Sequence, residues 1–167
     1  LARLLRQSIS NEDEVVPLAR EVEYAKGYLT IQKMRYKDKL EFEIDVEPSI
    51  LNIPLIKLVL QPIIENAIYH GLKYKESKGL LQVKGFMKDG NAVLQVIDNG
   101  VGMDEETLSH IYDKHKVNYH SNGVGVYNVQ KRLKLYYGEN YGITYESEKG
   151  VGTTATIIIP GIQEEAI

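Results

Sequence analysis

Apolar and polar residues recur along the chain with two different periods, and these periods predict its helices and strands. Apolar residues at helical spacing predict an amphipathic helix over residues 17–36, in which Gly27 is tolerated. Apolar and charged residues then alternate strictly over 40–46, which is typical of a half-buried strand. The apolar stretch 54–71 begins with proline, ends with glycine and is too long for one strand. It predicts a helix, which Pro62 should kink.

The remaining pattern predicts two hairpins, two further helices and a polar segment. In chain order these are strands at 79–86 and 91–97 joined by a Lys88-Asp89-Gly90 turn, a polar segment at 103–122 with a short helix at 104–112, a helix at 125–137, and strands at 142–148 and 153–159. The short links between paired strands cannot hold parallel crossovers. The order therefore predicts an α/β (α+β) two-layer sandwich, whose mostly antiparallel mixed sheet is covered on one face by helices.

Composition indicates one ordinary globular domain and excludes several classes of protein. Lys and Arg number 20 against 23 Asp and Glu, so the formal net charge is −3 and the basic footprint of a non-specific nucleic-acid binder is missing. The absence of cysteine excludes a disulfide framework, a thiol nucleophile and a cysteine zinc site. The chain starts at Leu1 within a helical pattern. We therefore expect residues 1–16 to end an upstream helix and linker, 17–162 to form the domain, and 163–167 to be a C-terminal tail.

Glycines gather in three G-x-G pairs at predicted element boundaries, where glycine allows positive φ and lets a phosphate or base approach the backbone. The pairs are Gly100 with Gly102, Gly123 with Gly125, and Gly150 with Gly152. One such pair is most often a tight turn, but three in one small domain also fit a nucleotide site. The middle pair opens a predicted helix, whose free N–H groups attract anions. Neither the P-loop nor the G-x-G-x-x-G fingerprint is present.

Four polar residues are candidates for chemistry at this site. Glu65, Asn66 and His70 interrupt the apolar helix predicted at 54–71, and Asn66 and His70 lie one turn apart on the same face. The Asn66 amide oxygen can ligate Mg²⁺ and the His70 imidazole can donate to a phosphate. The structural alternative is a buried hydrogen bond for Asn66 and a favourable helix end for His70. Asp98 is either a turn residue after a strand or an acceptor for the exocyclic amine of adenine.

Four segments, in this order, resemble the N, G1, G2 and G3 boxes of the GHKL (Bergerat-fold) ATP-binding domains. They are residues 61–71 (QPIIENAIYHG), 98–102 (DNGVG), 123–133 (GVGVYNVQKRL) and 150–154 (GVGTT). More narrowly, they look like the catalytic domain of a LytS/YesM-type sensor histidine kinase, and residues 28–36 resemble the linker of that subfamily. The resemblance extends over essentially the whole chain.

The resemblance implies a role for each matching residue. Asn66 would hold the Mg²⁺ that bridges the triphosphate of ATP, His70 would contact a phosphate, and Asp98 would read the adenine amine. Glu65 would polarise an acceptor histidine. Gly100 and Gly102 would contact the base. Residues 103–122 would form an ATP lid, which ends at Gly123, Val124 and Gly125. Gly152 and Thr154 would lie on the adenine side, with Thr153 as the alternative to Thr154.

Two departures from the family pattern shape the expected function. The phosphoacceptor histidine is missing, because all four histidines, His70, His110, His115 and His120, fall in the N box or the lid. Pro62 occupies the position at which the GHKL hydrolases have a water-activating glutamate, which disfavours hydrolysis. The resemblance thus implies the ATP-binding catalytic domain of a two-component sensor histidine kinase. Such a domain transfers the γ-phosphoryl group of ATP to a histidine on an upstream segment.

The same resemblance implies ATP and Mg²⁺ as cofactors, a homodimer that supplies the upstream phosphoacceptor domain, and a downstream response regulator. It also implies a cytoplasmic domain of a membrane-anchored protein, without nucleic-acid or direct membrane contact of its own. Two alternatives keep the fold. A GHKL-type ATPase or anti-sigma-like serine kinase would release phosphate or phosphorylate a serine, and a non-catalytic module would use ATP to gate an interaction with a partner.

Overall fold

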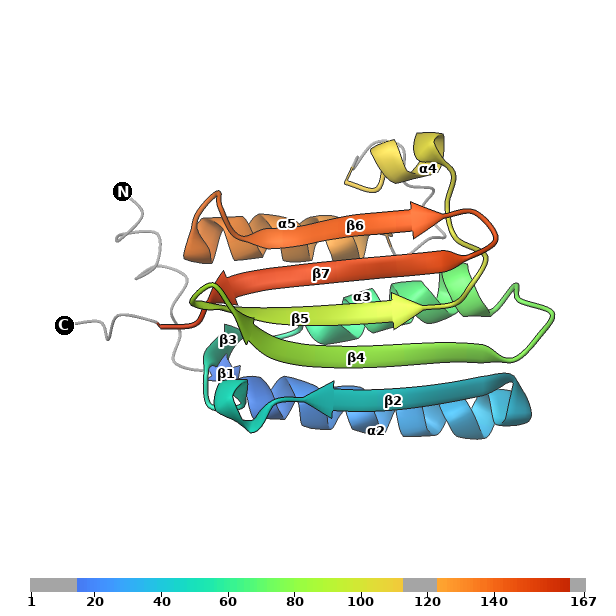
Figure 1. The fold of residues 1–167 in the computed structure, drawn as a ribbon, viewed down its shortest axis with the longest axis horizontal. Helices are drawn as coiled ribbons and strands as arrows, with labels where there is room; N and C mark the ends of the chain where they lie inside the picture. Colours follow the sequence, from blue (N-terminus) through green and yellow to red (C-terminus); the bar gives the residue numbers. More distant parts are fainter. Residues whose placement is uncertain (1–14, 113–122, 163–167) are drawn as a thin grey trace.

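A five-stranded mixed sheet forms one layer of the protein (Figure 1). The computed structural model describes residues 15–112 and 123–162. In spatial order the strands are β2 (Leu40–Val46), β4 (Gly79–Lys88), β5 (Asn91–Asp98), β7 (Gly152–Pro160) and β6 (Gly142–Glu148). Residues 1–14 of the expected upstream helix and linker, part of the lid (113–122) and the tail (163–167) lie outside the described residues.

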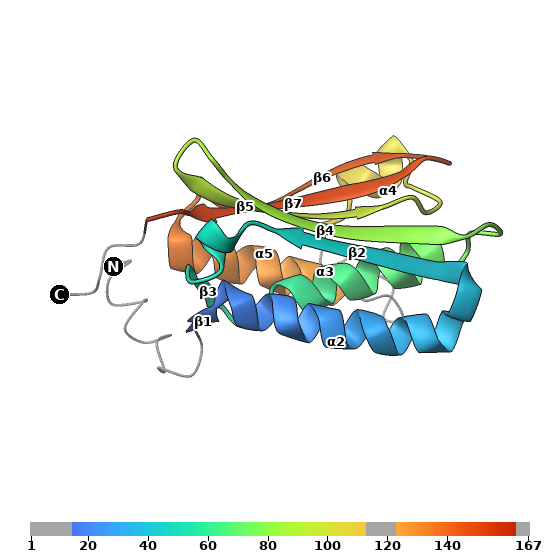
Figure 2. The ribbon, with the colours of Figure 1, turned by 60° about the horizontal axis from the view of Figure 1, so that its bottom comes forward.

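Helices form the second layer and cover one face of the sheet (Figure 2). They are α2 (Leu18–Tyr36), α3 (Leu60–Asn66), which continues into the π-helical turn η4 (Ala67–Leu72), and α5 (Gly123–Tyr137). Short 3-10 turns, η2 (Lys37–Lys39) and η3 (Pro48–Ile50), flank β2. The helix α4 (Glu105–Ser109) lies beside the β6 edge. The predicted two-layer architecture is confirmed.

The pairing of strands follows the length of the connections between them. The chain leaves β2 at Val46 and enters β4 at Gly79, and this long connection includes α3, so β2 and β4 pair in parallel. All other neighbours in the five-stranded sheet are antiparallel. Between β4 and β5 the turn residues Asp89 and Gly90 both have positive φ, 51° and 77°, as a hairpin with this type of two-residue turn requires.

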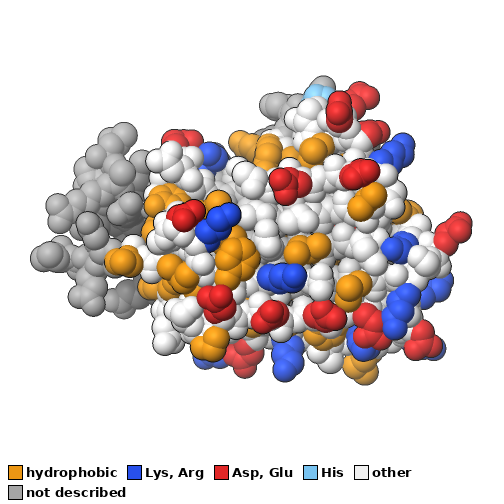
Figure 3. Space-filling view, viewed as in Figure 1, with side chains coloured by type: hydrophobic (Ala, Val, Ile, Leu, Met, Phe, Trp, Pro, Cys, Tyr) orange, Lys and Arg blue, Asp and Glu red, His pale blue; other side chains and the backbone are white. Residues whose placement is uncertain are grey.

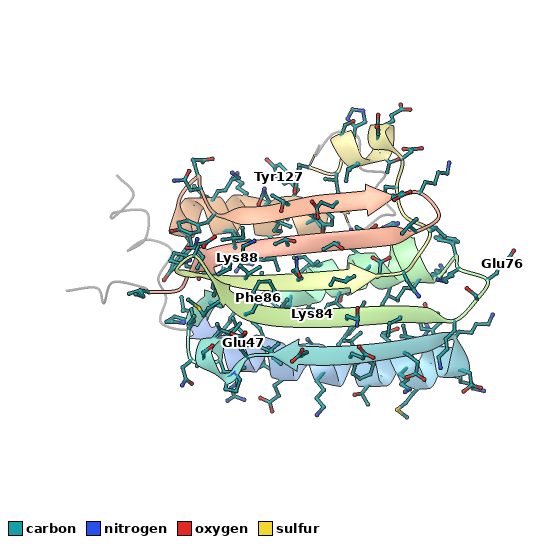
Figure 4. The ribbon with its side chains drawn as sticks, in the orientation of Figure 1. Glu47, Glu76, Lys84, Phe86, Lys88 and Tyr127 are labelled. Carbon is teal, nitrogen blue, oxygen red and sulfur yellow. The ribbon has the colours of Figure 1, made fainter. Side chains whose placement is uncertain are left out.

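The core lies between the helices and the inner face of the sheet. Its fully buried large side chains come from both layers and include Leu29, Leu60, Ile63, Ile64, Leu81, Leu94, Leu133 and Ile157. Alternation along β4 places Leu81 and Val83 in this core, whereas Lys84 and Phe86 lie on the outer face of the sheet (Figure 4). Burying the inner face is the main source of stability, at about 25 cal/mol for each Å² of apolar surface removed from water.

Acidic and basic side chains are interspersed on the outer face of the sheet, with apolar groups between them (Figure 3). No basic stripe crosses this face, which agrees with the charge balance of the sequence. Within residues 15–112 and 123–162, no helix is both long and apolar enough to cross a membrane.

The single helix predicted over 54–71 is wrong in its first part. Residues Pro54–Ile56 form the short strand β3, which pairs with β1 (Val15–Pro17), and the helix begins only at Leu60. Pro62 is therefore the third residue of α3, in the first turn, where helix N–H groups have no acceptor within the helix. A proline there removes no hydrogen bond, so the predicted mid-helix kink at Pro62 is also wrong. The irregularity lies further on, in η4.

Candidate nucleotide site

A pocket opens between the α3–η4 segment and the inner face of β5, β7 and β6. The sequence predicted five of its lining residues, namely Asn66, His70, Asp98, Gly102 and Thr153. The others are Ile63, Ala67, Gly71, Val96, Met103, Tyr145 and Ala155. The fold thus brings the first, second and fourth of the sequence motifs to one place.

Asp98 is the buried carboxylate of this pocket, with only 5% of its surface exposed. Its Oδ1 accepts a hydrogen bond from the backbone N–H of Gly100 at 2.8 Å. Burial raises the pKa of Asp98 to about 6, and the backbone N–H groups of Gly100 and Thr153 and the charge of Lys75 only partly oppose this. A group of this kind is ionised at neutral pH, and its free lone pairs can accept hydrogen bonds from a ligand.

Several glycines allow backbone segments to meet around Asp98. A Cβ on Gly71 would lie 2.7 Å from Asp98 Oδ1, and a Cβ on Gly100 would overlap the backbone of Gly71. In Gly102, φ is +65° and a Cβ would overlap the carbonyl oxygen of Glu148. Gly152, with φ of +144°, packs in the same way against the carbonyl oxygen of Asp98. These glycines are therefore needed for the close packing that holds the carboxylate, whatever ligand the pocket takes.

The third predicted motif supplies a different contact. The helix α5 begins at Gly123, the first glycine of that motif, and runs on through Val124 and Gly125. A Cβ on Gly125 would lie 3.4 Å from the Cβ of Pro62, so this glycine lies where the start of α5 packs beside the first turn of α3. Gly150 has open space around it but a φ of +83°, so it serves the turn between β6 and β7.

Substituting alanine for Gly100 should be destabilising, whereas the same change at Gly27 should not. The methyl group at Gly100 would meet backbone atoms of Gly71 that cannot rotate away, which we expect to cost about 2–3 kcal/mol in the free energy of unfolding. Gly27 lies on the exposed face of α2, where a Cβ would meet nothing within 4 Å. Alanine there should raise the free energy of unfolding by about 0.5–1 kcal/mol. Urea unfolding of both variants measures the difference, and equal effects would contradict this packing.

Asn66 and His70 lie at the pocket wall opposite the sheet, on α3 and η4. The His70 ring contacts Tyr69 edge to face, with centroids 6.0 Å apart. Burial, and then the charge of Lys73, lowers the pKa of His70 below its usual range, so the imidazole is neutral at pH 7 and can donate one hydrogen bond. Glu65 is not part of the pocket wall. Its Oε1 accepts from Gln61 Nε2 at 3.1 Å, and its charge acts on Tyr28 of α2.

Of the two threonines proposed for the adenine side, Thr153 lies in the pocket wall and Thr154 does not. Thr153 faces Asp98 across the β5–β7 ladder, and alternation along β7 turns Thr154 to the outer face. Thr153 is therefore the better placed of the two for a ligand in this pocket. Thr153 Oγ1 lies 2.7 Å from Ser147 Oγ, which in turn accepts from the backbone N–H of Met103 at 2.8 Å. This chain of contacts joins the pocket wall to the segment that leads into α4.

The start of the proposed lid is held by side chains that flank α4. Asp104 caps α4 by accepting from the Thr107 N–H at 2.8 Å. Tyr112 donates from its hydroxyl to the carbonyl oxygen of Ile143 at 2.7 Å. His110 follows α4 and does not line the pocket, while His115 and His120 lie outside the described residues.

Polar side chains of α2 and α5 fix the start of α3 and so position Asn66. Glu21, on α2 and only 3% exposed, accepts from the backbone N–H groups of Leu58, Val59 and Leu60 at 2.9, 3.0 and 3.1 Å. From α5, Arg132 Nη2 donates to the Lys57 carbonyl oxygen at 2.7 Å. Glu21 was not among the residues predicted from the sequence, although a charged residue on the apolar side of an amphipathic helix was a visible signal.

A model of the family described as histidine kinase-, DNA gyrase B- and HSP90-like ATPase matches residues 52–163, more than half of the chain. The chain belongs to this ATPase family. A second model, described as histidine kinase, matches residues 1–40.

The relatives of this ATPase domain narrow the resemblance to sensor kinases. The sensor histidine kinase YesM of Bacillus subtilis (strain 168) is 32% identical over 160 residues, which cover 96% of this chain and 26% of YesM. The sensor protein LytS of Oceanobacillus iheyensis is 34% identical over 143 residues, covering 84% of this chain and 24% of LytS. The resemblance to LytS/YesM-type kinases is confirmed. The chain spans about a quarter of the length of these curated relatives.

Solved structures show the same fold in histidine kinase catalytic domains. The catalytic domain of histidine kinase ThkA, in a nucleotide-free form, superposes with a TM-score of 0.67 at 14% identity, covering 89% of this chain and 98% of that one. The mycobacterial sensor histidine kinase MprB gives a TM-score of 0.64 at 20% identity, covering 88% and 96%. At these identities the likeness establishes the fold.

Proposed function

We propose that this domain binds Mg·ATP in the Asp98 pocket and transfers the γ-phosphoryl group to a histidine on an upstream segment of its parent sensor kinase. The observation that carries the proposal is the buried Asp98 carboxylate on the sheet, facing Asn66 and His70 on the helical wall of one pocket. Asp98 accepts a hydrogen bond from the exocyclic amine of adenine, and Val96 and Ala155 give the base an apolar surface.

The rest of the pocket suits a triphosphate. The neutral His70 imidazole donates a hydrogen bond to a phosphate oxygen, and the free N–H groups at the start of α5, near Gly123 and Val124, favour negative charge. The backbone N–H groups of Gly100 and Thr153 hold the Asp98 carboxylate in place.

The pocket also fits a metal ion that arrives with the nucleotide. Mg²⁺ in kinases is held by substrate phosphates, several waters and few protein oxygens, and it neutralises charge on the phosphates. Within the described residues no group of three or more acidic or histidine side chains could hold a metal. The Asn66 amide oxygen is the protein ligand that we assign to Mg²⁺, since it lies in the pocket wall on the His70 side.

In the proposed transfer, a nitrogen of the acceptor histidine attacks the γ-phosphorus, the bond from phosphorus to the bridging oxygen breaks, and ADP leaves. The domain contributes positioning and charge neutralisation rather than a nucleophile. Glu65 lies outside the pocket wall, where we assign it to orienting the incoming histidine. Pro62 lies one helical turn before Asn66, and it cannot activate water. Transfer is therefore favoured over hydrolysis.

The wider setting is proposed from the family membership and the YesM and LytS relatives. The parent protein is a homodimer anchored in the cell membrane, with this domain in the cytoplasm. The phosphohistidine then supplies a response regulator. Residues 1–40 match a histidine kinase model, which supports a direct connection from this domain to the phosphoacceptor segment.

Mg·ATP binding by this chain, followed by transfer to a separately supplied acceptor segment, tests the proposal. Calorimetry should detect binding at or below millimolar ATP, and radiolabelled phosphate should appear on the acceptor histidine in an acid-labile form. Absence of binding at millimolar ATP would overturn the nucleotide site. Rapid phosphate release without transfer, or a phosphoserine product, would replace the kinase assignment by the ATPase or serine-kinase alternative.

An Asn66→Asp variant should lose Mg-dependent transfer at least tenfold while keeping its affinity for adenosine, which carries no phosphate. The added carboxylate repels the phosphates and changes how the metal is held, but it leaves the Asp98 side of the pocket intact. Asn52→Asp, on an exposed residue outside the pocket, is the matched control and should transfer like the parent. If Asn66→Asp transfers at the parent rate, Asn66 does not hold the metal.

A further inference from the structure

Tyr145 is a pocket residue to which the sequence motifs assign no role. It lies on the edge strand β6, opposite Ala155 of β7, which in turn lies opposite Val96 of β5. All three residues line the pocket. Tyr145 therefore lies on the pocket face of the sheet, beside the small side chain of Ala155. Its ring also contacts Tyr112 edge to face, with centroids 6.1 Å apart.

The Tyr145 hydroxyl is buried and makes no hydrogen bond within residues 15–112 and 123–162. The Asn66 side chain is near enough to lower the pKa of Tyr145 as a hydrogen bond would, and the charge of Asp98 raises it. Neither side chain, however, meets the hydroxyl at the distance and angle of a formed hydrogen bond. Native proteins rarely leave a buried hydroxyl without a partner, because its desolvation is then uncompensated. Burial raises the pKa of Tyr145, so the group is a protonated O–H donor at every physiological pH. A donor without a protein partner, next to a carboxylate acceptor, points to a ligand that presents an acceptor beside a donor.

We propose that the Tyr145 hydroxyl donates a hydrogen bond to a ring nitrogen of the bound purine, next to the exocyclic amine that Asp98 accepts. This inference rests on the proposed function and names a specificity residue within that site. Adenine presents an acceptor ring nitrogen beside a donor amine, whereas guanine presents a carbonyl oxygen where adenine has the amine. Tyr145 and Asp98 together match adenine, and guanine would place an acceptor against the Asp98 carboxylate.

A Tyr145→Phe variant tests this contact, because it removes the hydroxyl and keeps the ring. We expect affinity for ADP without Mg²⁺, and for Mg·ATP, to fall by the same factor, about three- to tenfold, as for loss of one neutral hydrogen bond. The melting temperature of the free protein should stay the same or rise, since no protein hydrogen bond is lost. Tyr141→Phe, on a tyrosine outside the pocket, is the matched control and should leave affinity unchanged.

Deaza analogues of ADP identify the atom that Tyr145 contacts. Replacing one of the two ring nitrogens that flank the amine, N1 or N7, by carbon should weaken binding to the parent but not to Tyr145→Phe. The proposal is overturned if Tyr145→Phe binds ADP as tightly as the parent, if its loss appears only with Mg²⁺ present, or if both proteins respond equally to each analogue. It is also overturned if the variant is markedly less stable without nucleotide, because the hydroxyl then has a structural partner. A parent protein that binds no ADP would overturn the proposed function itself.

Discussion

An Asp98→Asn variant should bind ATP about ten- to a hundredfold more weakly than the parent at pH 8. The ionised carboxylate accepts a charge-assisted hydrogen bond from the adenine amine, and such bonds contribute about 1.5–3 kcal/mol. Asparagine keeps the volume, and its oxygen can still accept from the Gly100 N–H that Asp98 Oδ1 accepts at 2.8 Å. It then presents an NH₂ donor toward the adenine amine, which is itself a donor. Calorimetry with ATP and GTP measures the loss, and discrimination between the two bases should decrease.

The pH dependence separates this role from a general loss of structure. Because burial raises the pKa of Asp98 to about 6, the acceptor form is lost as pH falls through that value. ATP affinity of the parent should be constant above about pH 7 and decrease toward tenfold per pH unit below 6, whereas affinity of Asp98→Asn should change little. Asp45→Asn, an exposed change on β2, should reproduce the parent profile. Parallel profiles for parent and Asp98→Asn would show that Asp98 does not read the base.

The same pKa shift has a consequence for the free protein. Folding raises the pKa of Asp98 from 3.8 to about 6, so the folded state binds the proton more tightly than the unfolded state does. This contribution to stability is full below about pH 4 and is lost as pH rises toward 6. The ionised acceptor in the pocket therefore lowers the free energy of unfolding of the parent at neutral pH. A hydrogen bond from bound adenine restores part of that stability.

Local patterns were sufficient to predict most of the sheet and its layers. Strict alternation marked β2, and the Asp89-Gly90 pair marked the β4–β5 hairpin, because the information for a turn or a half-buried strand lies within a few residues. The glycine pairs predicted a site, and the structure shows why they lie where they do. Around Asp98 they let the backbones near Gly71, Gly102 and Gly152 approach each other.

The segment before α3 could not be predicted in this way, because its conformation depends on distant residues. Leu58 has a φ of 59°, in the left-handed region that a bulky side chain seldom adopts, and its own side chain is 56% exposed. Its N–H donates to Glu21, 37 residues earlier in the chain. Similarly, the Tyr145 hydroxyl reaches the pocket only because β6 and β7 pair in the observed register. The helical pattern of α2 shows that Glu21 is buried, but neither its partners before α3 nor the β6–β7 register leaves a periodic signal in the sequence.

Replacing Glu21 with alanine should therefore destabilise the domain by about 3–4 kcal/mol in the free energy of unfolding. Glu21 is the cap of α3, since its carboxylate accepts the N–H groups of Leu58, Val59 and Leu60, and the last two residues are fully buried. Alanine leaves these donors without their acceptor, two of them in fully buried residues. The loss is large because hydrogen bonds to a charged group contribute more than neutral ones. Alanine is also the best helix former, so α2 itself does not suffer.

Glu23→Ala is the matched control, because Glu23 is on the same helix but, among the residues that the structure describes, pairs only with Arg20, at 3.3 Å on the exposed surface. Its effect should be within about 0.5 kcal/mol. Glu21→Gln should fall between the two, since the amide retains one acceptor oxygen but turns its NH₂ toward backbone donors. Hydrogen exchange locates the effect: the amides of Val59 and Leu60 should be protected in the parent and exchange faster in Glu21→Ala. Equal unfolding curves for Glu21→Ala and Glu23→Ala would mean that α3, and with it Asn66, is positioned by the packing of its apolar face alone.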